Sequence, residues 1–441
     1  MASLFQHQGT ANDPPIAADL LDIAVVGAGY VGVVTGAGLA SFGHRVRLID
    51  RSPDIVARLN RGRAGFHEPG LDDLLVAAIG CGRITATTDL TAAVQTSDVT
   101  FICVGTPPGQ DGACDLRHVR EAAWEIGGAL AGSVRPHTVV TKSTVPPCTA
   151  RDVVRPAVTG QSGRRDIAVA ANPEFLREGS AVRDFLNPDR IVIGADSQDD
   201  GAALERLYAP FSCPVVRCDC ATAEMIKYAS NAMLAVRISA ANEIGSLCKP
   251  LGIDANAVLA AVGMDRRIGS SFLRAGLGFG GSCLPKDVRA LAALGRARDR
   301  PVWILEMALA VNAAQTQALL ELVRRRVGFS GKRIAVLGLA FKPGTDDVRE
   351  SIAISVVRGL TARGAEVVAY DPMAMDRFGE FAPFIEYAES AEQAMQGSDA
   401  VVIVTEWPAF EEIDYAGKVV IDGRGCAAAR ATARVYDGLC W

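Results

Sequence analysis

Residues 27–32 read Gly-Ala-Gly-Tyr-Val-Gly and directly follow a short apolar run that begins at Asp22. A buried strand that ends in such a glycine turn and continues into a helix is typical of a dinucleotide-binding βαβ unit. Gly27 permits the tight turn, Gly29 lets the main chain approach a pyrophosphate, and Gly32 allows the helix to pack closely on the strand. The start of the helix would offer unpaired N–H groups and a partial positive charge to the phosphates.

The apolar run at 45–50 predicts the second strand of this unit, and it closes at Asp50. An acidic residue at this point, about 20 residues after the glycines, would bind the hydroxyls of the adenine ribose. It would also repel a 2′-phosphate, so the sequence favours NAD over NADP as the cofactor. The adjacent Arg51 keeps NADP open as the alternative.

Further apolar runs at 99–105 and 138–144 predict more strands in the same half of the chain. From about residue 332 the pattern starts again, with strand-like runs at 332–341 and 366–371 on either side of a helical segment. Residues 398–408 also match residues 97–107 in order and residue type. The chain therefore has two related βαβ-type halves, of which the second lacks the glycine fingerprint.

Between the halves the strand signals vanish, and helical patterns remain at 222–251 and at 301–327, where Pro301 suits a first helical position. The predicted fold class is therefore α/β, with two Rossmann-like, doubly wound parallel-sheet domains joined by a central α-helical region. The predicted parts are a mobile leader (1–21), an NAD-binding Rossmann domain (22–214), a helical connector and dimerisation domain (215–327) and a C-terminal nucleotide-sugar-binding domain (328–441).

Composition excludes several other classes of protein. A net charge of −5 gives no global basic field for nucleic acid. The uncharged stretch 23–43 is long enough to span a membrane, but it contains six glycines, so no membrane association is expected. The odd number of cysteines, 11, indicates a reducing compartment, and we expect a cytoplasmic protein. Cys213, Cys218 and Cys220 have no fourth ligand nearby, so no metal is expected.

The segment 280–287, Gly-Gly-Ser-Cys-Leu-Pro-Lys-Asp, is the most informative of the chain for chemistry. Pro285 suits the first turn of a helix, which would place Cys283 just ahead of the N-terminus of that helix. The helix dipole and the nearby Lys286 would both favour the thiolate. Asp287 falls four residues after the cysteine and within reach of the same side. This pattern predicts a reactive cysteine, although most of the other cysteines are expected to be small core side chains.

Three polar residues elsewhere are further candidates. Lys227 and Asn231 are four residues apart on a predicted helix, so they share a face, and their neighbours are mostly apolar. Glu174 follows the predicted strand at 167–172, where a carboxylate is well placed for a site. Each of them alone also fits an ordinary surface residue or a solvated loop.

Taken together, these motifs resemble the UDP-glucose 6-dehydrogenase family, within the nucleotide-sugar dehydrogenases that also oxidise UDP-N-acetylmannosamine and GDP-mannose. The resemblance covers nearly the whole chain, from Asp22 to about Arg424. Its motifs are GAGYVG at 27–32, VGTP at 104–107, KSTVP at 142–146, NPEFLREGSAVRDFLNPDRIVIG at 172–194, KYASN at 227–231, GFGGSCLPKD at 278–287, FKPGTDDVRES at 341–351 and DGR at 422–424.

The resemblance implies a four-electron oxidation of a hexose CH2OH to a carboxylate, with two NAD+ reduced in turn and UDP-glucuronate as the product. Asp287 with Lys227, through an ordered water, would take the alcohol proton. Cys283 would capture the aldehyde as a thiohemiacetal and then carry a thioester. Lys227 and Asn231 would stabilise the oxyanion.

The same resemblance implies roles in hydrolysis and in binding. Glu174 would be the base for thioester hydrolysis, with Thr144 positioning the water. The residues placed around NAD are Gly27, Gly29, Tyr30, Val31, Gly32, Asp50, Arg51, Val104, Thr106, Pro107, Ser143, Thr144, Glu178, Cys283, Lys286 and Arg349. Those placed around the nucleotide sugar are Glu174, Phe175, Leu176, Arg177, Glu178, Lys227, Asn231, Arg267, Phe272, Leu273, Arg274, Gly276, Gly278, Phe279, Gly280, Phe341, Lys342 and Arg424. Arg267 would come from a partner subunit, which implies a homodimer or a higher homo-oligomer.

One position departs from the family pattern and leaves alternatives for the substrate. Leu284 stands where the bacterial UDP-glucose enzymes usually have phenylalanine, and a Leu-Pro pair resembles the GDP-mannose branch. UDP-glucose is the leading substrate, and TDP-glucose, GDP-mannose and UDP-N-acetylmannosamine are the alternatives for the same chemistry. A two-electron hydroxy-acid dehydrogenase and a non-catalytic module that senses NAD or a sugar nucleotide are the rival functions. The hydroxy-acid dehydrogenase gives no reason for Cys283 or the second βαβ half. The intact set of Cys283, Lys227, Asp287 and Glu174 speaks against the non-catalytic module.

Overall fold

The computed structural model describes residues 19–441, so most of the predicted leader lies outside the described residues. The chain divides into two compact units. The first contains the described residues up to Pro107 together with Cys114–Tyr228, and the second contains Pro108–Ala113 and Ala229–Trp441. The boundary between the two units falls inside one long helix.

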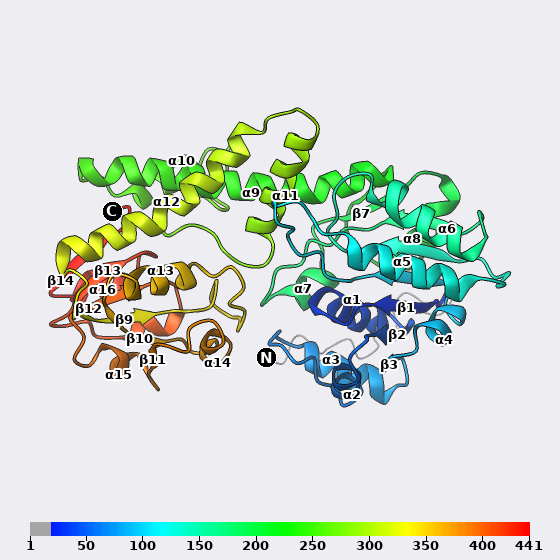
Figure 1. Cartoon of the computed structure of the whole chain (residues 1–441), viewed down its shortest axis with the longest axis horizontal. Helices are drawn as coiled ribbons and strands as arrows, with labels where there is room; N and C mark the ends of the chain where they lie inside the picture. Colours follow the sequence, from blue (N-terminus) through cyan, green and yellow to red (C-terminus); the bar gives the residue numbers. More distant parts are fainter. Residues whose placement is uncertain (1–18) are drawn as a thin grey trace. The chain divides into compact units, whose positions relative to one another are not determined.

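The first unit is built on an eight-stranded sheet (Figure 1). Its strands are β1 (Asp22–Val26), β2 (Arg45–Ile49), β3 (Ile84–Thr87), β4 (Val99–Ile102), β5 (Thr138–Thr141), β6 (Ala168–Ala171), β7 (Ile191–Ala195) and β8 (Val215–Cys218). Their order is β3-β2-β1-β4-β5-β6-β7-β8, in which β1 pairs in parallel with both β2 and β4. The strand order therefore reverses between β1 and β4, the point where open α/β sheets bind their ligands.

Helices cover both faces of this sheet (Figure 1). They are α1 (Tyr30–Ser41), α2 (Pro53–Leu59), α3 (Leu71–Gly80), α4 (Leu90–Gln95), α5 (Arg117–Leu130), the π-helix η1 (Ala150–Val154), α6 (Arg155–Ser162), α7 (Ala181–Leu186) and α8 (Gln198–Tyr208). Ile23 and Val25 of β1 pack into one buried cluster, and the alternating Ala24 and Val26 pack into another. Burial on both faces explains why β1 is continuously apolar, and it confirms the predicted doubly wound unit.

Two features of this sheet differ from the sequence prediction. β6 and β7 pair antiparallel, with Ala170 opposite Ala195, whereas an all-parallel sheet was expected. The connection between them holds only the six-residue helix α7, without the long crossover helix that usually links parallel neighbours. β8 is the edge strand of the first sheet. The domain boundary predicted at residue 214 would therefore separate β8 from the sheet to which it belongs. Most β8 side chains are exposed, and its four residues Val-Val-Arg-Cys are too short an apolar run to indicate a strand clearly.

The second unit has a six-stranded sheet of the same type, in which the neighbouring strands pair in parallel. Its strands are β9 (Arg333–Leu337), β10 (Glu366–Tyr370), β11 (Glu386–Tyr387), β12 (Ala400–Ile403), β13 (Val419–Asp422) and β14 (Val435–Gly438). Around them lie α13 (Ile352–Thr361), α14 (Met375–Gly379), α15 (Ala391–Met395), the 3-10 helix η3 (Pro408–Glu412) and α16 (Ala427–Thr432). The order β11-β10-β9-β12-β13-β14 repeats that of the first six strands of unit one, which confirms the predicted relation of the halves.

The region between the sheets is helical, as predicted. It contains α9 (Cys220–Cys248), the 3-10 turn η2 (Lys249–Leu251), α10 (Ala255–Gly263), α11 (Leu284–Ala297) and α12 (Trp303–Arg326). The predicted position of Pro301 is wrong, because α12 has Val302 as its N-cap and starts at Trp303. The α-helical pattern of α9 ends before Pro250, whose ring is incompatible with a continuing α-helix. No helix in residues 19–441 combines the length and the apolar character that crossing a membrane requires.

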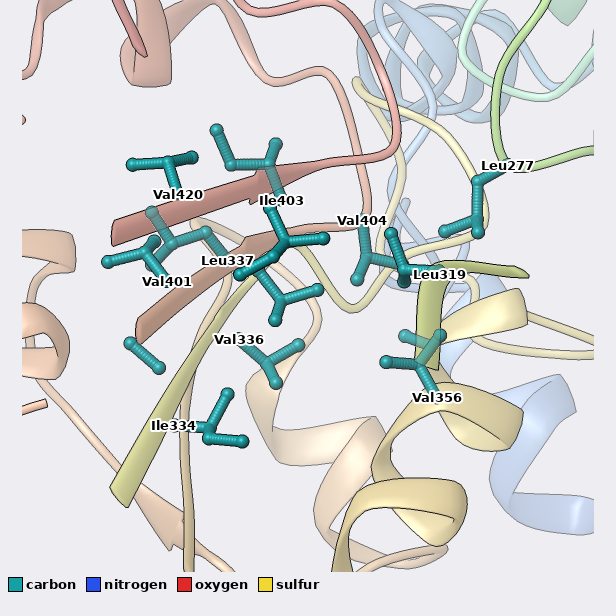
Figure 2. Close-up of a cluster of buried hydrophobic side chains, with 14 of the residues drawn as sticks. Leu277, Leu319, Ile334, Val336, Leu337, Val356, Val401, Ile403, Val404 and Val420 are labelled. Atoms are coloured by element: carbon teal, nitrogen blue, oxygen red, sulfur yellow. The ribbon is translucent and has the colours of Figure 1, made fainter. Parts of the chain in front are cut away.

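The core of the second unit fixes a loop that carries several predicted site residues. Figure 2 shows Val336, Leu337, Ile403 and Val404 from the central strands and the turns that follow them, and Leu277 packs in the same cluster. The main-chain N–H of Leu277 donates a 2.9 Å hydrogen bond to the carbonyl of Gly423. Side-chain burial and this hydrogen bond therefore hold the glycine-rich segment around Leu277 against the end of β13.

Candidate functional site

The glycine turn after β1 has the geometry that the sequence predicts. Gly27 has φ +99°, and a Cβ placed on it would lie 2.7 Å from the carbonyl oxygen of Cys103. A Cβ on Gly32 would collide with the carbonyl of Gly27, so only glycine permits this approach of α1 to the turn. A Cβ on Gly29 would meet nothing within 4 Å, so Gly29 faces open space at the start of α1. Open space beside a helix N-terminus fits a bound pyrophosphate.

Asp50 follows β2 beside this turn. Its carboxylate accepts hydrogen bonds from the main-chain N–H of Ala28, at 3.2 Å, and of Ser52, at 3.0 Å. The guanidinium of Arg51 forms ion pairs with Glu125 at 2.7 Å and Glu121 at 3.3 Å, both on α5. These carboxylates, Glu125 first, raise the pKa of Arg51. The Asp50 carboxylate is therefore hydrogen-bonded to the glycine turn, whereas the Arg51 guanidinium is paired with α5.

The loops after β4 and β5 also come together. The Ser143 hydroxyl donates to the carbonyl of Val104 at 2.7 Å, and the Thr106 hydroxyl donates to the carbonyl of Thr144 at 2.9 Å. The predicted cofactor residues of both loops thus lie at the carboxyl ends of adjacent strands next to the reversal of strand order. The buried Lys142 in the second loop donates to the side-chain oxygen of Asn172 at 2.8 Å.

A buried ion pair lies in the first unit between two of the predicted catalytic residues. The Lys227 ammonium is 2.9 Å from a carboxylate oxygen of Glu174, and both side chains are buried. The second carboxylate oxygen of Glu174 accepts the main-chain N–H of Leu176 at 2.6 Å. Burial alone would raise the pKa of Glu174, but the attraction of Lys227, the Leu176 hydrogen bond and the charge of Lys142 lower it. Glu174 is therefore held as a carboxylate, the form that a base requires.

Cys283 occupies the N-cap of α11 in the second unit, with Pro285 in the first turn, as predicted. The thiol is exposed, and the Ser282 hydroxyl lies 3.6 Å from its sulfur. At this position the partial positive charge of the helix N-terminus acts on the sulfur and favours the thiolate. The geometry supports a nucleophile that a ligand can reach.

Asp287 lies one turn further along α11 and is fully buried. Its carboxylate accepts a 2.6 Å hydrogen bond from the side-chain amide of Asn231 on α9 and forms an ion pair with Lys286. The structure therefore pairs Lys286 with this carboxylate, whereas the sequence predicts that Lys286 favours the thiolate of Cys283. Asp287 and Asn231 form a polar group within the second unit, and Glu174 and Lys227 form another within the first.

The segment before Cys283 lines a cavity of about 200 Å³ in the second unit. Arg274 donates to the carbonyl of Arg424 at 2.6 Å. Arg424 donates in turn to the carbonyl of Val404 at 2.6 Å and to that of Gly278 at 3.2 Å. The other residues that line this cavity are Ile238, Phe272, Ala275, Gly276 and Glu406. Two fixed guanidinium groups make this cavity suitable for a ligand that carries phosphate.

Glycines in the same segment permit close packing with the loop around 341–350. Gly281 has φ +86°, and a Cβ there would lie 2.7 Å from the Phe341 ring. A Cβ on Gly280 would collide with the carbonyl of Glu350. The Lys342 ammonium lies 5.4 Å from the centre of the Phe341 ring. Gly280 and Gly281 therefore allow the segment before Cys283 to pack directly against this loop.

Other predicted site residues make contacts outside these groups. Arg177 pairs with Asp184, Arg267 with Asp265 and Arg349 with Asp347, each at 2.6 or 2.7 Å. The Phe279 ring packs in a small core cluster, and Leu273 packs against the main core of the second unit. Glu178 is half-buried in the segment after β6.

Cys220 directs its thiol to the carbonyl of Gly194 at 3.4 Å. No three His, Cys, Asp or Glu side chains in residues 19–441 are arranged to hold a metal ion.

Sequence reasoning missed two carboxylates. Glu406 lies 3.2 Å from the Nε of Arg424, and the signal for it was present, since its segment follows β12 as the VGTP segment at 104–107 follows β4. Glu68 is buried in the loop between α2 and α3, and it accepts hydrogen bonds from Tyr30 and from the main chain at Gly179 and Ala181. No sequence pattern predicts contacts between residues so far apart in the chain.

Comparison with protein families gives matches over almost the whole chain. Models of the UDP-glucose/GDP-mannose dehydrogenase family match in three consecutive parts. The NAD binding domain matches residues 21–212, the central domain residues 221–314, and the UDP binding domain residues 335–429. The two parts with sheets thus correspond to the NAD and the UDP binding domains.

Individual proteins are similar over nearly their full length. UDP-glucose 6-dehydrogenase AglM from Haloferax volcanii is 45% identical over 417 residues, which cover 92% of this chain and 96% of that protein. GDP-mannose 6-dehydrogenase from Azotobacter vinelandii is 36% identical over 439 residues, which cover 95% of this chain and 100% of that protein. The structure of a UDP-glucose dehydrogenase from Pyrobaculum islandicum superposes with a TM-score of 0.95 at 44% identity, covering 97% of this chain and 99% of that one.

Proposed function

Because the chain belongs to the UDP-glucose/GDP-mannose dehydrogenase family, we propose that it oxidises the C6 alcohol of UDP-glucose to the carboxylate of UDP-glucuronate. When bound, NAD+ accepts the hydride that leaves C6 in each of the two oxidations. The observation that carries the proposal is the exposed Cys283 at the N-cap of α11, with the buried carboxylate of Asp287 one turn behind it. A two-electron hydroxy-acid dehydrogenase has no use for this nucleophile.

The first oxidation requires a group that takes the hydroxyl proton. The proposal assigns this proton to Asp287 together with Lys227, through an ordered water. Asn231 holds the Asp287 carboxylate at 2.6 Å, so its position is fixed before the substrate arrives. Proton loss and departure of the hydride convert the CH2OH group into an aldehyde.

Cys283 then keeps the aldehyde on the protein. The thiolate sulfur forms a bond to C6, and the carbonyl oxygen takes up a proton to give a thiohemiacetal. Loss of a second hydride from C6 and of the hydroxyl proton leaves a thioester. The proposal assigns stabilisation of the negatively charged oxygen to Lys227 and Asn231, and a donor of this kind is worth about 3–4 kcal/mol.

Hydrolysis releases the product and restores the thiol. Glu174, whose pKa is lowered by Lys227, is a carboxylate and can take a proton from the attacking water, which Thr144 would position. The C–S bond breaks and the thiolate leaves, so one water is consumed for two hydrides removed. The buried ion pair between Glu174 and Lys227, at 2.9 Å, supports the use of Glu174 in its charged form.

The second unit and the similar proteins together support the choice of UDP as the nucleotide. Its UDP binding domain supports a nucleotide-sugar substrate, and the cavity with Arg274 and Arg424 supports a place for the diphosphate. UDP-glucose is preferred to GDP-mannose because relatives named for UDP-glucose are up to 45% identical, against 36% for the GDP-mannose relative. Leu284 remains the position that favours the GDP-mannose branch.

The proposal includes a second copy of the chain as the partner. The first turns of α12 expose Trp303, Ile304 and Met307, with Trp303 72% exposed. Three large apolar side chains on one short stretch of helix favour burial against another protein surface. Arg267, which is exposed, would then reach the site of the partner, and the assembly would work in the cytoplasm.

A substrate panel and a stoichiometry measurement test the function. UDP-glucose, TDP-glucose, GDP-mannose and UDP-N-acetylmannosamine are each supplied with NAD+, and NADH is counted per sugar consumed. The proposal expects two NADH per UDP-glucose and slower turnover of the other three. Cys283→Ser should abolish steady NADH production while nucleotide-sugar binding survives, and Cys81→Ser, at another exposed cysteine, is the matched control. One NADH per sugar, or full turnover by Cys283→Ser, would overturn the mechanism.

A further inference from the structure

Glu68 is a buried carboxylate for which the proposed chemistry has no use. It lies in the loop between α2 and α3, and only 6% of its surface is exposed. A buried carboxylate is costly unless its oxygens accept hydrogen bonds. The groups that satisfy it come from two separate parts of the first unit.

One Glu68 oxygen accepts the hydroxyl of Tyr30 and, at 2.7 Å, the main-chain N–H of Gly179. The other accepts the main-chain N–H of Ala181 at 2.7 Å and that of Val182 at 3.4 Å. Tyr30 is the first residue of α1 and directly follows Gly29 of the glycine turn. A single side chain thus joins the cofactor end of α1 to the start of α7.

The segment that Glu68 holds continues directly from predicted site residues. Glu178 immediately precedes Gly179, and Glu174, with its bond to Leu176, lies in the same connection between β6 and α7. Tyr30 is itself fixed, because its ring packs against Phe66 with ring centres 4.9 Å apart. A change in the first turn of α1 would therefore act on residues 178–182 through one carboxylate.

We propose that Glu68 is a positioning residue that couples the dinucleotide turn to the segment 174–182. A bound dinucleotide holds the first turn of α1, Tyr30 holds Glu68, and Glu68 holds the main chain next to Glu178. Cofactor binding thereby orders the segment that the sugar needs, and the two ligands bind cooperatively. The sugar half of this inference rests on the proposed function, whereas the link between Tyr30 and residues 179–182 does not.

Tyr30→Phe is the decisive variant, because it removes the link to α1 and leaves the Glu68 bonds to Gly179 and Ala181 in place. Glu68→Gln is the second variant, in which an amide NH2 would face the N–H of either Gly179 or Ala181. Asp73→Asn is the matched control, since it neutralises an exposed carboxylate on neighbouring α3. All are made in the full chain, and hydrogen exchange of residues 176–183 is measured with and without NADH.

In the unmodified protein and in Asp73→Asn, NADH should slow amide exchange in residues 176–183. In Tyr30→Phe saturated with NADH, the first turn of α1 should be protected, but the protection of residues 176–183 should be lost. Equal protection of that segment in Tyr30→Phe and the unmodified protein would overturn the proposal, because the cofactor would then act on it directly. No protection of the segment in the unmodified protein would overturn it as well.

A second measurement separates coupling from a merely structural role. The dissociation constant of NADH is measured with and without UDP, and the ratio should be about fivefold or more in the unmodified protein. Tyr30→Phe should bring this ratio close to one, whereas a purely structural defect would weaken both values and leave the ratio unchanged. Exchange and binding need no turnover, so failure of the proposed activity with every sugar is a separate outcome.

Discussion

The ammonium of Lys227 lies 2.9 Å from the carboxylate of Glu174, and neither side chain reaches solvent to a significant degree. The two residues come from different elements, one from α9 and the other from the loop after β6. Each charge is stabilised in the interior mainly by the other, with help for Glu174 from the Leu176 hydrogen bond and the charge of Lys142. This dependence makes the pair a sensitive point for both stability and activity.

Lys227→Met is expected to destabilise the protein by about 3–5 kcal/mol at pH 7, because it leaves a buried carboxylate without its cation. In the unmodified protein the pKa of Glu174 is lowered, so the stabilisation is present above the usual carboxyl pKa and is lost as pH falls through the lowered value. In the variant the pKa of Glu174 rises, and protonation at lower pH should recover part of the lost stability. Urea unfolding between about pH 2 and pH 8 measures both trends.

The control for this prediction is Arg63→Met, which breaks the exposed ion pair with Asp72. That change should cost about 1 kcal/mol or less and should show little dependence on pH. If Lys227→Met proved no more destabilising than Arg63→Met, Glu174 would have to be solvated or protonated in the folded protein.

The parts of the fold that follow from local sequence were predicted, and those that depend on distant pairing were not. The glycines at 27, 29 and 32 and Asp50 belong to one βαβ unit, so their spacing alone placed them correctly. Pro285 likewise located the start of α11 and, with it, the N-cap position of Cys283. In contrast, the contacts of Glu68 with Gly179 and of Glu406 with Arg424 arise only when the chain folds. β8 was missed because a run of four residues is too short to indicate a strand clearly.

Asp287→Asn is expected to lower kcat by about 10²- to 10⁴-fold, because it removes the proposed proton acceptor and preserves the shape of the side chain. The asparagine oxygen can still accept the amide of Asn231, so KM for the nucleotide sugar should change little. Asp299→Asn is the matched control, since Asp299 is exposed beyond the end of α11 and its positive φ suits asparagine. Steady-state kinetics of both variants check the prediction, and an unchanged kcat in Asp287→Asn would assign the proton to another group.

Arg424→Lys is expected to raise KM for the nucleotide sugar by roughly tenfold or more, with a smaller effect on kcat. A lysine keeps the positive charge but cannot reproduce the bonds of one guanidinium to Val404, Gly278 and Glu406. Arg430→Lys, at an exposed arginine paired with Asp254, should leave both constants unchanged. Equal KM values for Arg424→Lys and the unmodified enzyme would show that the cavity around Arg424 does not bind the substrate.

The cofactor preference separates the roles of Asp50 and Arg51. Arg51 is engaged by Glu121 and Glu125, so Arg51→Ala should leave KM for NAD and the preference over NADP unchanged. Its stability should fall by at most about 1 kcal/mol, because both ion pairs are exposed. Asp50→Ala should raise KM for NAD and allow measurable turnover with NADP, since the carboxylate that repels a 2′-phosphate is gone. Initial rates with both cofactors decide the matter: a fall in NADP turnover caused by Arg51→Ala would mean that this arginine leaves its carboxylate partners to bind the 2′-phosphate.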